Sequence, residues 1–446
     1  MLSFPQVSPG ARAVLILGAS TRAAAQSAFR AGLAPLCGDQ FADADLRAIA
    51  PVLEIADYPR GMVGAAAQAP DCPWMYTGGL ENHPSLVGQI AAARPLWGNG
   101  AEVLERVRNP WEVARVLEEA GLPACRLIPR EELPSAYGRW LLKRLRGAGG
   151  RGIRVWSSRE PARTKINRDV YFQEYRSGGS CSALFLASGE VQQVGASPAG
   201  VPPSGGMAAP GAAGVERRSP AKAGTPAPPA EAGTPTLLLG FTRQLVGIDS
   251  VHAPPFGWCG NIAPVQLPAR AAAEIRHIGE CLGRHFSLRG LFGCDFIIDD
   301  QHAWLTEVNP RYPASTELLE WAFGIPFLDW HCRACQGAQS PEGLAWAECS
   351  ARVAKPQACG VAGKIVLYAN RSIIAPDFGR FIGRPGFAPC LDSSCRALPS
   401  LADIPSPGTR ISAGQPIATL YARAGTEREC LAKLLRRAKR FQDALI

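Results

Sequence analysis

The chain has 446 residues, more than one ordinary domain holds, and this length suggests two to four domains. Hydrophobic residues make up 47% and charged residues 19% of the sequence, which excludes a generally disordered protein. The longest early apolar run, residues 13–17, is far shorter than the roughly 18 residues that a membrane-spanning helix needs. No secretory signal is visible, so we expect a cytoplasmic protein that does not associate with membranes.

The net charge of +9 raises the question of a nucleic-acid partner. Only 7 of the 47 basic residues are Lys, and no basic stripe with interleaved aromatic residues occurs. Arg together with abundant Ala, Gly and Pro is typical of GC-rich coding. We therefore expect no nucleic-acid partner, and anionic small substrates fit the charge equally well.

The 14 cysteines lie at irregular spacings, which is typical of reduced, buried thiols rather than of a disulfide framework. One Cys-x-x-Cys pair, Cys332 and Cys335, follows His331 and could be joined with Cys390 and Cys395 into a zinc site. Because no second pair with matching spacing occurs, scattered reduced cysteines are the favoured interpretation.

The N-terminal segment predicts an α/β unit. Residues 12–20 indicate a buried strand that enters a turn, and residues 21–31 indicate a helix closed by Gly32. The turn contains Gly18 but lacks the glycine-rich fingerprint of dinucleotide binding, so NAD is not expected. Arg22 could contact an anionic substrate at this helix N-terminus, although a lone Arg is more often a surface residue.

A second helix is predicted over residues 109–120, with Asn109 as its cap and Pro110 at its first position. Its predicted apolar face consists of Trp111, Ala114, Val116 and Leu117.

Residues 140–143 and 153–156 indicate two strands that flank the glycine-rich segment 147–152, an arrangement that predicts a hairpin lid. Lys143 ends the first strand, where its ammonium group could neutralise phosphate oxygens while the N–H groups of the loop cover them. Residues 171–175 predict a further strand, where backbone groups could meet an adenine edge and Glu174 could accept a hydrogen bond from its amino group or from the ribose.

Residues 198–236 contain 10 Ala, 9 Pro and 7 Gly in 39 positions and no aromatic residue. Such a composition cannot bury enough apolar surface to offset the entropy of ordering it. We therefore expect a disordered surface insertion between strands.

Residues 274–286 predict a core-packed helix, and residues 293–298 and 303–309 predict an antiparallel hairpin. Asp295 lies on its first strand, and alternation on the second makes Glu307 and Asn309 project together. Three oxygen ligands of this kind suit Mg²⁺ whose coordination is completed by nucleotide phosphates and water. Taken alone, these residues could also be the rim of an ordinary hairpin.

From about residue 350 onward, short β-like runs such as residues 363–369 alternate with Gly and Pro turns. This pattern predicts a small, separate β-rich domain that ends in an amphipathic helix, with Leu431, Leu434 and Phe441 on its inward face.

Taken in order, Lys143, the glycine loop, Gln173 to Tyr175, Asp295 and the run from Glu307 to Arg311 resemble the ATP-grasp superfamily. The Glu-x-Asn-Pro-Arg form looks most like its biotin-carboxylase-related branch. The resemblance implies an α/β (α+β) architecture in three parts. These are a Rossmann-like N-terminal domain over 1–105, an ATP-grasp domain over 106–335 with the disordered insertion 198–236, and a small β-rich domain over 336–446.

The resemblance also implies roles for individual residues. ATP would be bound by Lys143, by Gly149, Gly150 and Gly152 of the lid, and by Glu174 and Tyr175 at the adenine. One or two Mg²⁺ ions, for which Mn²⁺ could substitute, would be held by Asp295, Glu307 and Asn309. Arg311 would be the catalytic residue, stabilising an acyl-phosphate or the tetrahedral anion formed from it. A second phosphate-binding Lys is expected near residue 109, where Arg108 or Arg115 would have to replace it.

The whole chain looks most like predicted ATP-dependent carboxylate ligases encoded beside genes of methanopterin-linked one-carbon metabolism, in segments 37–46, 311–315, 403–405 and 414–417. This resemblance implies a carboxylate–amine ligase that acts on a small-molecule carboxylate and an amine through an acyl-phosphate, with release of ADP and phosphate. It suggests an amino-acid or pterin-type acceptor, and it is compatible with a homodimer. A biotin-type carboxylase without an attached carrier and a non-catalytic ATP-binding module are the alternatives.

Overall fold

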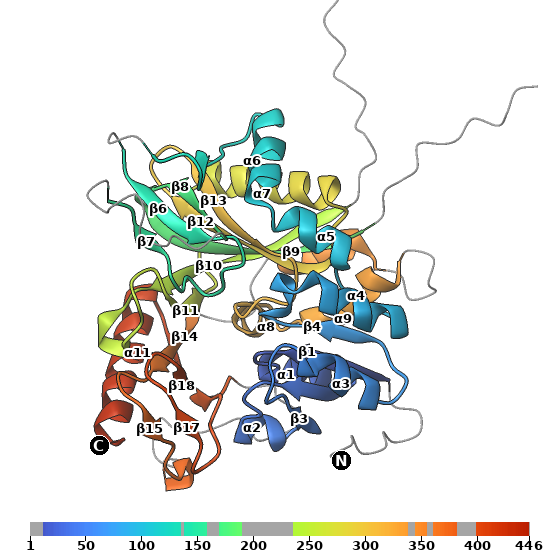
Figure 1. The fold of residues 1–446 in the computed structure, drawn as a ribbon, viewed down its shortest axis with the longest axis vertical. Helices are drawn as coiled ribbons and strands as arrows, with labels where there is room; N and C mark the ends of the chain where they lie inside the picture. The colour runs from blue at the N-terminus through green and yellow to red at the C-terminus, as the bar shows by residue number, and fades with distance from the viewer. Residues whose placement is uncertain are drawn as a thin grey trace, which may run out of the picture.

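The computed structural model describes residues 12–134, 138–157, 169–189, 235–337, 344–354, 360–380 and 398–445. Within these ranges the strands form four sheets. Figure 1 shows the N-terminal unit in blue beside the end of the chain in red, with the green and yellow middle of the chain above both.

The N-terminal unit is a four-stranded parallel sheet in the order β3-β2-β1-β4. The core residues of β1 from Val14 to Leu17 are fully buried, as expected for a parallel strand that is covered on both faces. The predicted α/β opening is therefore confirmed. The elements of this unit are β1 (Ala13–Gly18), α1 (Arg22–Arg30), β2 (Ala34–Asp39), α2 (Ala44–Arg47), β3 (Val52–Glu54), α3 (Gly61–Gln68), β4 (Trp74–Tyr76), η1 (Leu80–Asn82), α4 (Pro84–Ala93) and α5 (Ala101–Val107).

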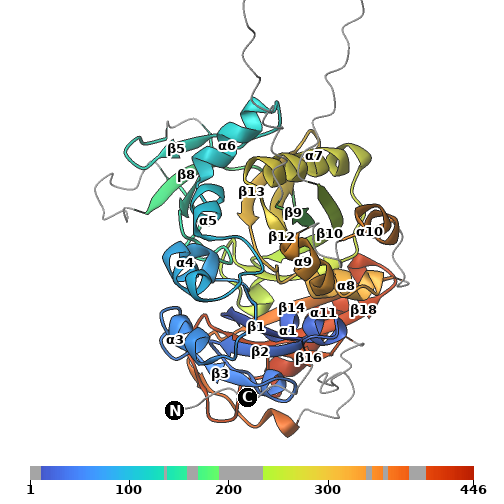
Figure 2. The ribbon, with the colours of Figure 1, turned by 90° about the vertical axis from the view of Figure 1, so that its right-hand side faces the viewer.

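The large sheet has eight strands in the order β13-β12-β9-β10-β11-β14-β18-β16, each antiparallel to its neighbours. Side chains alternate between its two faces. Phe185 and Phe292 pack with α7 on one face, whereas Leu184 and Leu291 pack with α8 and α9 on the other (Figure 2). The elements are β9 (Gly179–Ser188), β10 (Thr236–Val246), β11 (Trp258–Ala263), α7 (Ala269–His285), β12 (Arg289–Ile298), β13 (Ala303–Asn309), α8 (Thr316–Phe323) and α9 (Phe327–Gln336).

The predicted helix over 274–286 is confirmed within α7, and the predicted hairpin over 293–309 is confirmed as β12 and β13, which pair Asp295 with Glu307. The side chains that suggested the helix, including Ile275 and Leu282, are fully buried, and they form a core with the two strands.

Three C-terminal strands, β14, β16 and β18, belong to the large sheet, whereas β15 and β17 pair in a two-stranded sheet of their own. Gly260 in β11 pairs with Ile365 in β14, so the large sheet continues unbroken into the last part of the chain. The division of the chain at 335/336 stays a prediction. The remaining elements are α10 (Trp346–Val353), β14 (Val361–Tyr368), β15 (Ile373–Ile374), η3 (Phe378–Arg380), β16 (Leu401–Ala402), β17 (Arg410–Ile411), β18 (Pro416–Ala424) and α11 (Glu427–Asp443), with η2 (Asp249–Val251) before β11.

The predicted C-terminal amphipathic helix is α11, which packs on β14 and β18 through the buried residues Leu434, Ala438 and Phe441. None of the described helices combines the length and the apolar content that crossing a membrane would require.

A second four-stranded sheet, in the order β5-β8-β6-β7, contains the two strands predicted on either side of the glycine loop. Its strands β6 and β7 are antiparallel neighbours on either side of the glycine loop, so the predicted hairpin is confirmed. The elements are α6 (Pro110–Glu119), β5 (Leu127–Pro129), β6 (Trp140–Arg144), β7 (Arg154–Val155) and β8 (Val170–Glu174).

Helix α6 begins where the sequence predicts, because the side chain of Asn109 accepts hydrogen bonds from the N–H groups of Trp111 and Glu112. Its buried face differs from the predicted apolar face, and Ala114 is only half-buried. Trp111 is 37% exposed and lies beside the ring of Tyr171, whereas Val113, Val116 and Leu117 fill the buried face.

The predicted insertion over 198–236 lies mostly outside the described residues, which resume at residue 235. Strands β9 and β10 flank it and are antiparallel neighbours, with Thr236 opposite Ala187. Because Thr236 is the first residue of β10, the insertion ends before that residue.

His331 in α9 joins the large sheet to the N-terminal unit. Its Nδ1 accepts a hydrogen bond from the N–H of Leu291 at 2.8 Å, and its Nε2 donates to the carbonyl of Trp97 at 3.2 Å. Burial lowers the pKa of His331 to about 4. The unfolded chain takes up a proton near pH 6.5, so the native state loses stability as the pH falls from there to about 4.

We expect this one residue to contribute a loss of up to about 3 kcal/mol in the free energy of unfolding over that pH range. His331→Asn should be less stable than wild type at neutral pH but should lose less further stability on acidification, as measured by urea titration at several pH values. The matched control is His285→Asn, because His285 is 33% exposed. If wild type and His331→Asn lose stability in parallel, His331 is not the group responsible.

Candidate functional site

Two cavities of similar size meet at Arg311. The lid cavity, about 520 Å³, lies between the glycine loop and the hairpin of β12 and β13. The interdomain cavity, about 530 Å³, lies between the N-terminal unit and the C-terminal strands. The residues that line both are Ala19, Gly78, Trp258, Arg311 and Ala314.

The three residues predicted as metal ligands lie together in the wall of the lid cavity. Asp295 accepts a hydrogen bond from the Ser182 hydroxyl at 2.6 Å and another from the Asn309 amide at 3.2 Å. Burial, together with the neighbouring Glu307 carboxylate, raises the pKa of Asp295 to about 6. A divalent cation would relieve this repulsion, so two carboxylates and an amide oxygen fit Mg²⁺.

Arg108 is the arginine that reaches this site. Its Nη1 donates to Glu307 at 2.8 Å, and its Nη2 donates to the carbonyl of Gly147 in the glycine loop at 3.0 Å. It also lines a smaller cavity of about 90 Å³ with Lys143 and Glu307. Arg115 pairs instead with Glu119, and both side chains are more than half exposed. Of the two arginines considered as replacements for the expected Lys, only Arg108 is near the site.

Lys143 keeps its charge available to a ligand. Its Nζ donates to the side chain of Gln173 at 3.0 Å and to the carbonyl of Thr306 at 2.8 Å, which are both neutral acceptors. In the described part of the chain, no carboxylate lies within ion-pair distance of Lys143. The ammonium group lines the lid cavity beside the predicted metal ligands.

The glycine loop is docked against the segment before β11. The N–H of Trp258 donates to the carbonyl of Gly149 at 3.1 Å. Gly150 has a φ of +73°, and a Cβ at this residue would lie 1.9 Å from the carbonyl oxygen of Phe256. Only glycine permits so close an approach. Gly149 and Gly150 line the lid cavity, whereas Gly152 lies outside its wall.

Glu174 and Tyr175, the predicted adenine contacts, also line the lid cavity. Glu174 is paired with Arg176 at 2.7 Å, and the guanidinium of Arg139 lies 4.0 Å from the centre of the Tyr175 ring. Their roles toward adenine stay a prediction.

Glu81 belongs to the site although no sequence motif pointed to it. It lies in η1, is 2% exposed and accepts a hydrogen bond from Arg311 Nε at 3.0 Å, while Arg311 Nη2 donates to Asn309 at 3.1 Å. Burial acts to raise the pKa of Glu81, but Arg311 and Arg108 outweigh burial and lower it. Glu81 follows β4, near the carboxyl end of a parallel strand. Because ligands bind at such ends, this position could have identified Glu81 as a candidate site residue.

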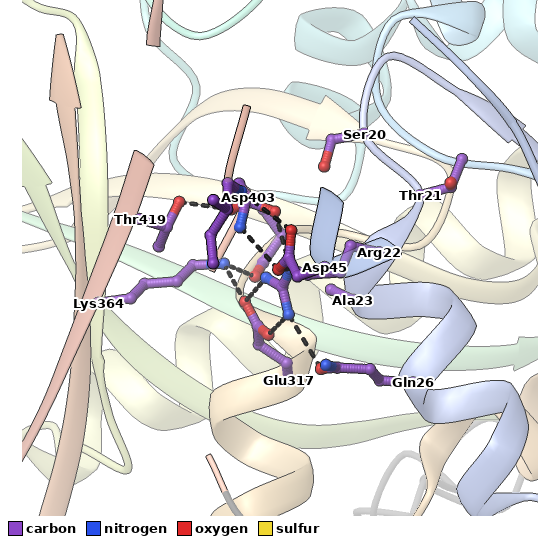
Figure 3. Close-up of polar contacts among 12 residues, drawn as sticks. Ser20, Thr21, Arg22, Ala23, Gln26, Asp45, Glu317, Lys364, Asp403 and Thr419 are labelled. Carbon is purple, nitrogen blue, oxygen red and sulfur yellow. Dashed lines mark hydrogen bonds and ion pairs between the residues drawn. The ribbon is translucent and has the colours of Figure 1, made fainter. Parts of the chain in front are cut away.

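Arg22 is a buried residue, which corrects the expectation that it lies on the surface. Its guanidinium is 3% exposed and donates to Asp403 at 2.7 Å and to Glu317 at 3.1 Å (Figure 3). Lys364 lies 2.7 Å from the same Glu317. Despite burial, Arg22 and Lys364 hold the pKa of Glu317 well below its usual range. These charges form one wall of the interdomain cavity.

The zinc site considered from the sequence lies only partly within the described residues. Cys332 and Cys335 are buried in α9, while Cys390 and Cys395 lie outside the described residues. In the described ranges, no three His, Cys, Asp or Glu side chains are grouped so that they could hold a metal ion. Ten of the eleven described thiols are buried, as expected for reduced cysteines.

Comparisons with known proteins concern the family and the fold of this chain. A model of the ATP-grasp domain family matches residues 231–315. A comparison with curated protein sequences finds no match.

Several solved structures are similar over almost the whole chain. L-amino acid ligase from Bacillus licheniformis aligns with a TM-score of 0.62 at 14% identity, over 96% of this chain and 97% of that one. N5-carboxyaminoimidazole ribonucleotide synthetase from Thermus thermophilus aligns with 0.58 at 14% identity, over 96% and 98%. Biotin carboxylase from Campylobacter jejuni aligns with 0.56 at 15% identity, over 95% and 89%. The predicted fold class is confirmed: this chain has the ATP-grasp fold.

Proposed function

We propose that this protein is an ATP-dependent ligase that joins a carboxylate to an amine through an acyl-phosphate, with release of ADP and phosphate. The observation that carries the proposal is the place of Arg311 in the wall of both cavities. One cavity can then hold the nucleotide while the other holds the substrates, with Arg311 between them.

The lid cavity has the properties that a nucleotide triphosphate requires. Lys143 offers a cation without a carboxylate partner in the described chain, and the backbone of Gly149 and Gly150 can approach phosphate oxygens. Asp295, Glu307 and Asn309 would hold Mg²⁺, which when bound neutralises charge on the phosphates. One similar protein, the biotin carboxylase domain of Hydrogenobacter thermophilus 2-oxoglutarate carboxylase, was solved in complex with MgADP.

In the proposed reaction, a carboxylate oxygen attacks the terminal phosphorus of ATP and ADP leaves. The amine nitrogen then attacks the acyl carbon of the acyl-phosphate, phosphate leaves and the nitrogen loses a proton. Negative charge develops on oxygen in both steps, and Arg311, held by Glu81, is placed to stabilise it. Glu81 acts through Arg311 and is a positioning residue.

Two of the similar proteins are an L-amino acid ligase and a carboxyaminoimidazole ribonucleotide synthetase, which supports a ligase rather than a binding module. The link to methanopterin-linked one-carbon metabolism rests on the sequence resemblance alone.

Replacing Lys143 tests the nucleotide site. Lys143→Met removes the charge but keeps much of the volume, so the Kd of Mg-ATP should rise roughly 10- to 100-fold, as expected for a charge-assisted hydrogen bond of about 1.5–3 kcal/mol. Titration calorimetry measures this Kd. Arg115→Met is the control, because Arg115 is exposed and paired with Glu119. An unchanged Kd in folded Lys143→Met protein would remove Lys143 from the site.

Replacing Arg311 tests the chemical step. Because a lone substitution would leave Glu81 buried without its partner, we suggest Arg311→Met combined with Glu81→Gln. The turnover rate should fall by roughly two orders of magnitude or more, with little change in the Kd of Mg-ATP, because the charge that Arg311 meets develops only during the reaction. A loss confined to nucleotide affinity would place Arg311 in ATP binding instead.

The products test the reaction class. Incubation with ATP and candidate carboxylates and amines should release ADP and phosphate in step with amide formation. AMP as the stoichiometric product would contradict the acyl-phosphate mechanism. ADP release that requires bicarbonate and no amine would favour the carboxylase alternative, and ATP binding without any release would favour a binding module.

A further inference from the structure

The lining of the interdomain cavity is mixed. Asp43 and Asp403 are among its acidic residues, and Phe41, Tyr312 and Ile417 are among its apolar ones. Its cations are Arg22, Arg151, Arg311, Lys364 and Arg410. Its volume of about 530 Å³ is far larger than an ion or a water molecule requires, so it suits a small organic molecule.

Four carboxylates surround Arg22, namely Glu317, Asp43, Asp45 and Asp403. The second cation of this cluster, Lys364, also lies against Glu317. Because Arg151, Arg311 and Arg410 line the same cavity, it is the surroundings of Asp43 that are acidic and not the cavity as a whole.

Three of these four carboxylates have hydrogen-bonding partners. Glu317 accepts from both cations, and Asp403 accepts from Arg22 Nε and from the Thr419 hydroxyl. Asp45 accepts from the N–H groups of Asp403 and Ile404, each at 2.9 Å. Figure 3 shows Asp45, Asp403 and Glu317 gathered around Arg22.

Asp43 is the exception. Its side chain is 8% exposed and lines the cavity, yet no described residue hydrogen-bonds to it, not even the helix α2 that it precedes. Buried polar groups without partners are rare in native proteins, because each costs free energy that a partner would recover. Burial, with the charges of Asp403, Asp45 and Asp39, raises the pKa of Asp43 well above its usual range. Three carboxylates and one guanidinium group, that of Arg22, thus act on this carboxyl group, and this setting favours a further cation beside it.

We propose that the substrate in the interdomain cavity carries an ammonium group and that Asp43 is the residue that pairs with it. The assignment of this ligand as a substrate rests on the proposed ligase function. An ammonium group donates hydrogen bonds, which the Asp43 side chain lacks among the described residues, and its positive charge offsets the carboxylates that surround Asp43. The apolar residues would contact the carbon skeleton, and Arg311 lines the same cavity, so the bound molecule reaches the reaction centre.

A simple alkylamine and the amino group of an amino acid share this chemistry. The test therefore screens primary alkylamines, diamines and the standard amino acids against the full-length protein by thermal shift, and each binder is then titrated by calorimetry. Each binder is compared with its N-acetylated counterpart, which lacks the positive charge. We expect at least one free amine to bind at least tenfold more tightly than its acetylated form. Binding of alkylamines would show that the site accepts a simple alkylamine. Binding of amino acids alone would show that the site requires the amino group of an amino acid.

The variant Asp43→Asn should weaken this binding at least tenfold while leaving the melting temperature equal or higher, because it removes a buried charge that lies among other carboxylates. The matched control is Glu54→Gln. Glu54 lines the same cavity but is 55% exposed and already paired with Arg47, so its replacement should leave binding unchanged.

Equal binding of acetylated and free amines, unaltered binding by Asp43→Asn, or no amine bound at all would overturn the proposal. A clear loss of stability in Asp43→Asn would also overturn it, because Asp43 would then serve folding. The Kd of Mg-ATP and the release of ADP are measured on the same preparations. If amines bind in a way that depends on Asp43 but do not stimulate ADP release, the ligase function is contradicted and the amine site is retained. If ADP is released without such binding, only the present inference is contradicted.

Discussion

A guanidinium group is tolerated inside a protein only where carboxylates replace its lost water, and Arg22 meets this condition with groups from distant parts of the chain. It comes from α1, while Glu317 comes from α8 and Asp403 directly follows β16. Tyr421 in β18 donates to Glu317 and accepts from Arg22. None of these groups could stay buried if the others moved away. The N-terminal unit is thereby fixed against the large sheet, and the interdomain cavity is fixed between them.

Carboxylates also hold the guanidinium groups in and near the lid cavity. Arg311 is paired with Glu81, Arg176 with Glu174 and Arg108 with Glu307, so these groups have defined positions and partly cancelled charges. Lys143 differs because its acceptors in the described chain are neutral. A polyanion that entered the lid cavity would therefore meet Lys143, whose full charge is available, and also Arg176 and Arg311, whose attraction is shared with carboxylates.

The parts that the sequence predicts well depend on local signals. Strand alternation and a short turn indicated the hairpin that pairs Asp295 with Glu307, and the cap at Asn109 indicated the start of α6. The parts that it missed depend on partners far away in the chain. Glu81 and Arg311 are separated by 230 positions, and Arg22 and Asp403 by 381. No periodicity or spacing rule connects residues so far apart, and Arg22 therefore looked like an isolated surface residue.

The continuation of the large sheet into the C-terminal strands was missed for a related reason. The runs after residue 360 predict strands, but which edge they pair with is set by β11, about 100 positions earlier. This pairing places Lys364 in a strand next to β11, where it can reach Glu317. The contact between Lys364 and Glu317 depends on tertiary structure, which the local sequence pattern does not predict.

The junction between β9 and β10 determines how freely the segment between these two strands can change in length during evolution or by protein engineering. The N–H of Ser188 donates to the carbonyl of Pro235, so the chain leaves the sheet and returns to it at neighbouring positions. Ser182, which contacts Asp295, lies six residues before Ser188 in the same extended strand, a separation of roughly 20 Å. Lengthening a connection between ends that are already close costs little entropy, only about 0.6 kcal/mol for each doubling. Segments of very different size can therefore be exchanged here over evolutionary time, and a reporter domain can be grafted at the same point, without disturbing the residues that line the lid cavity.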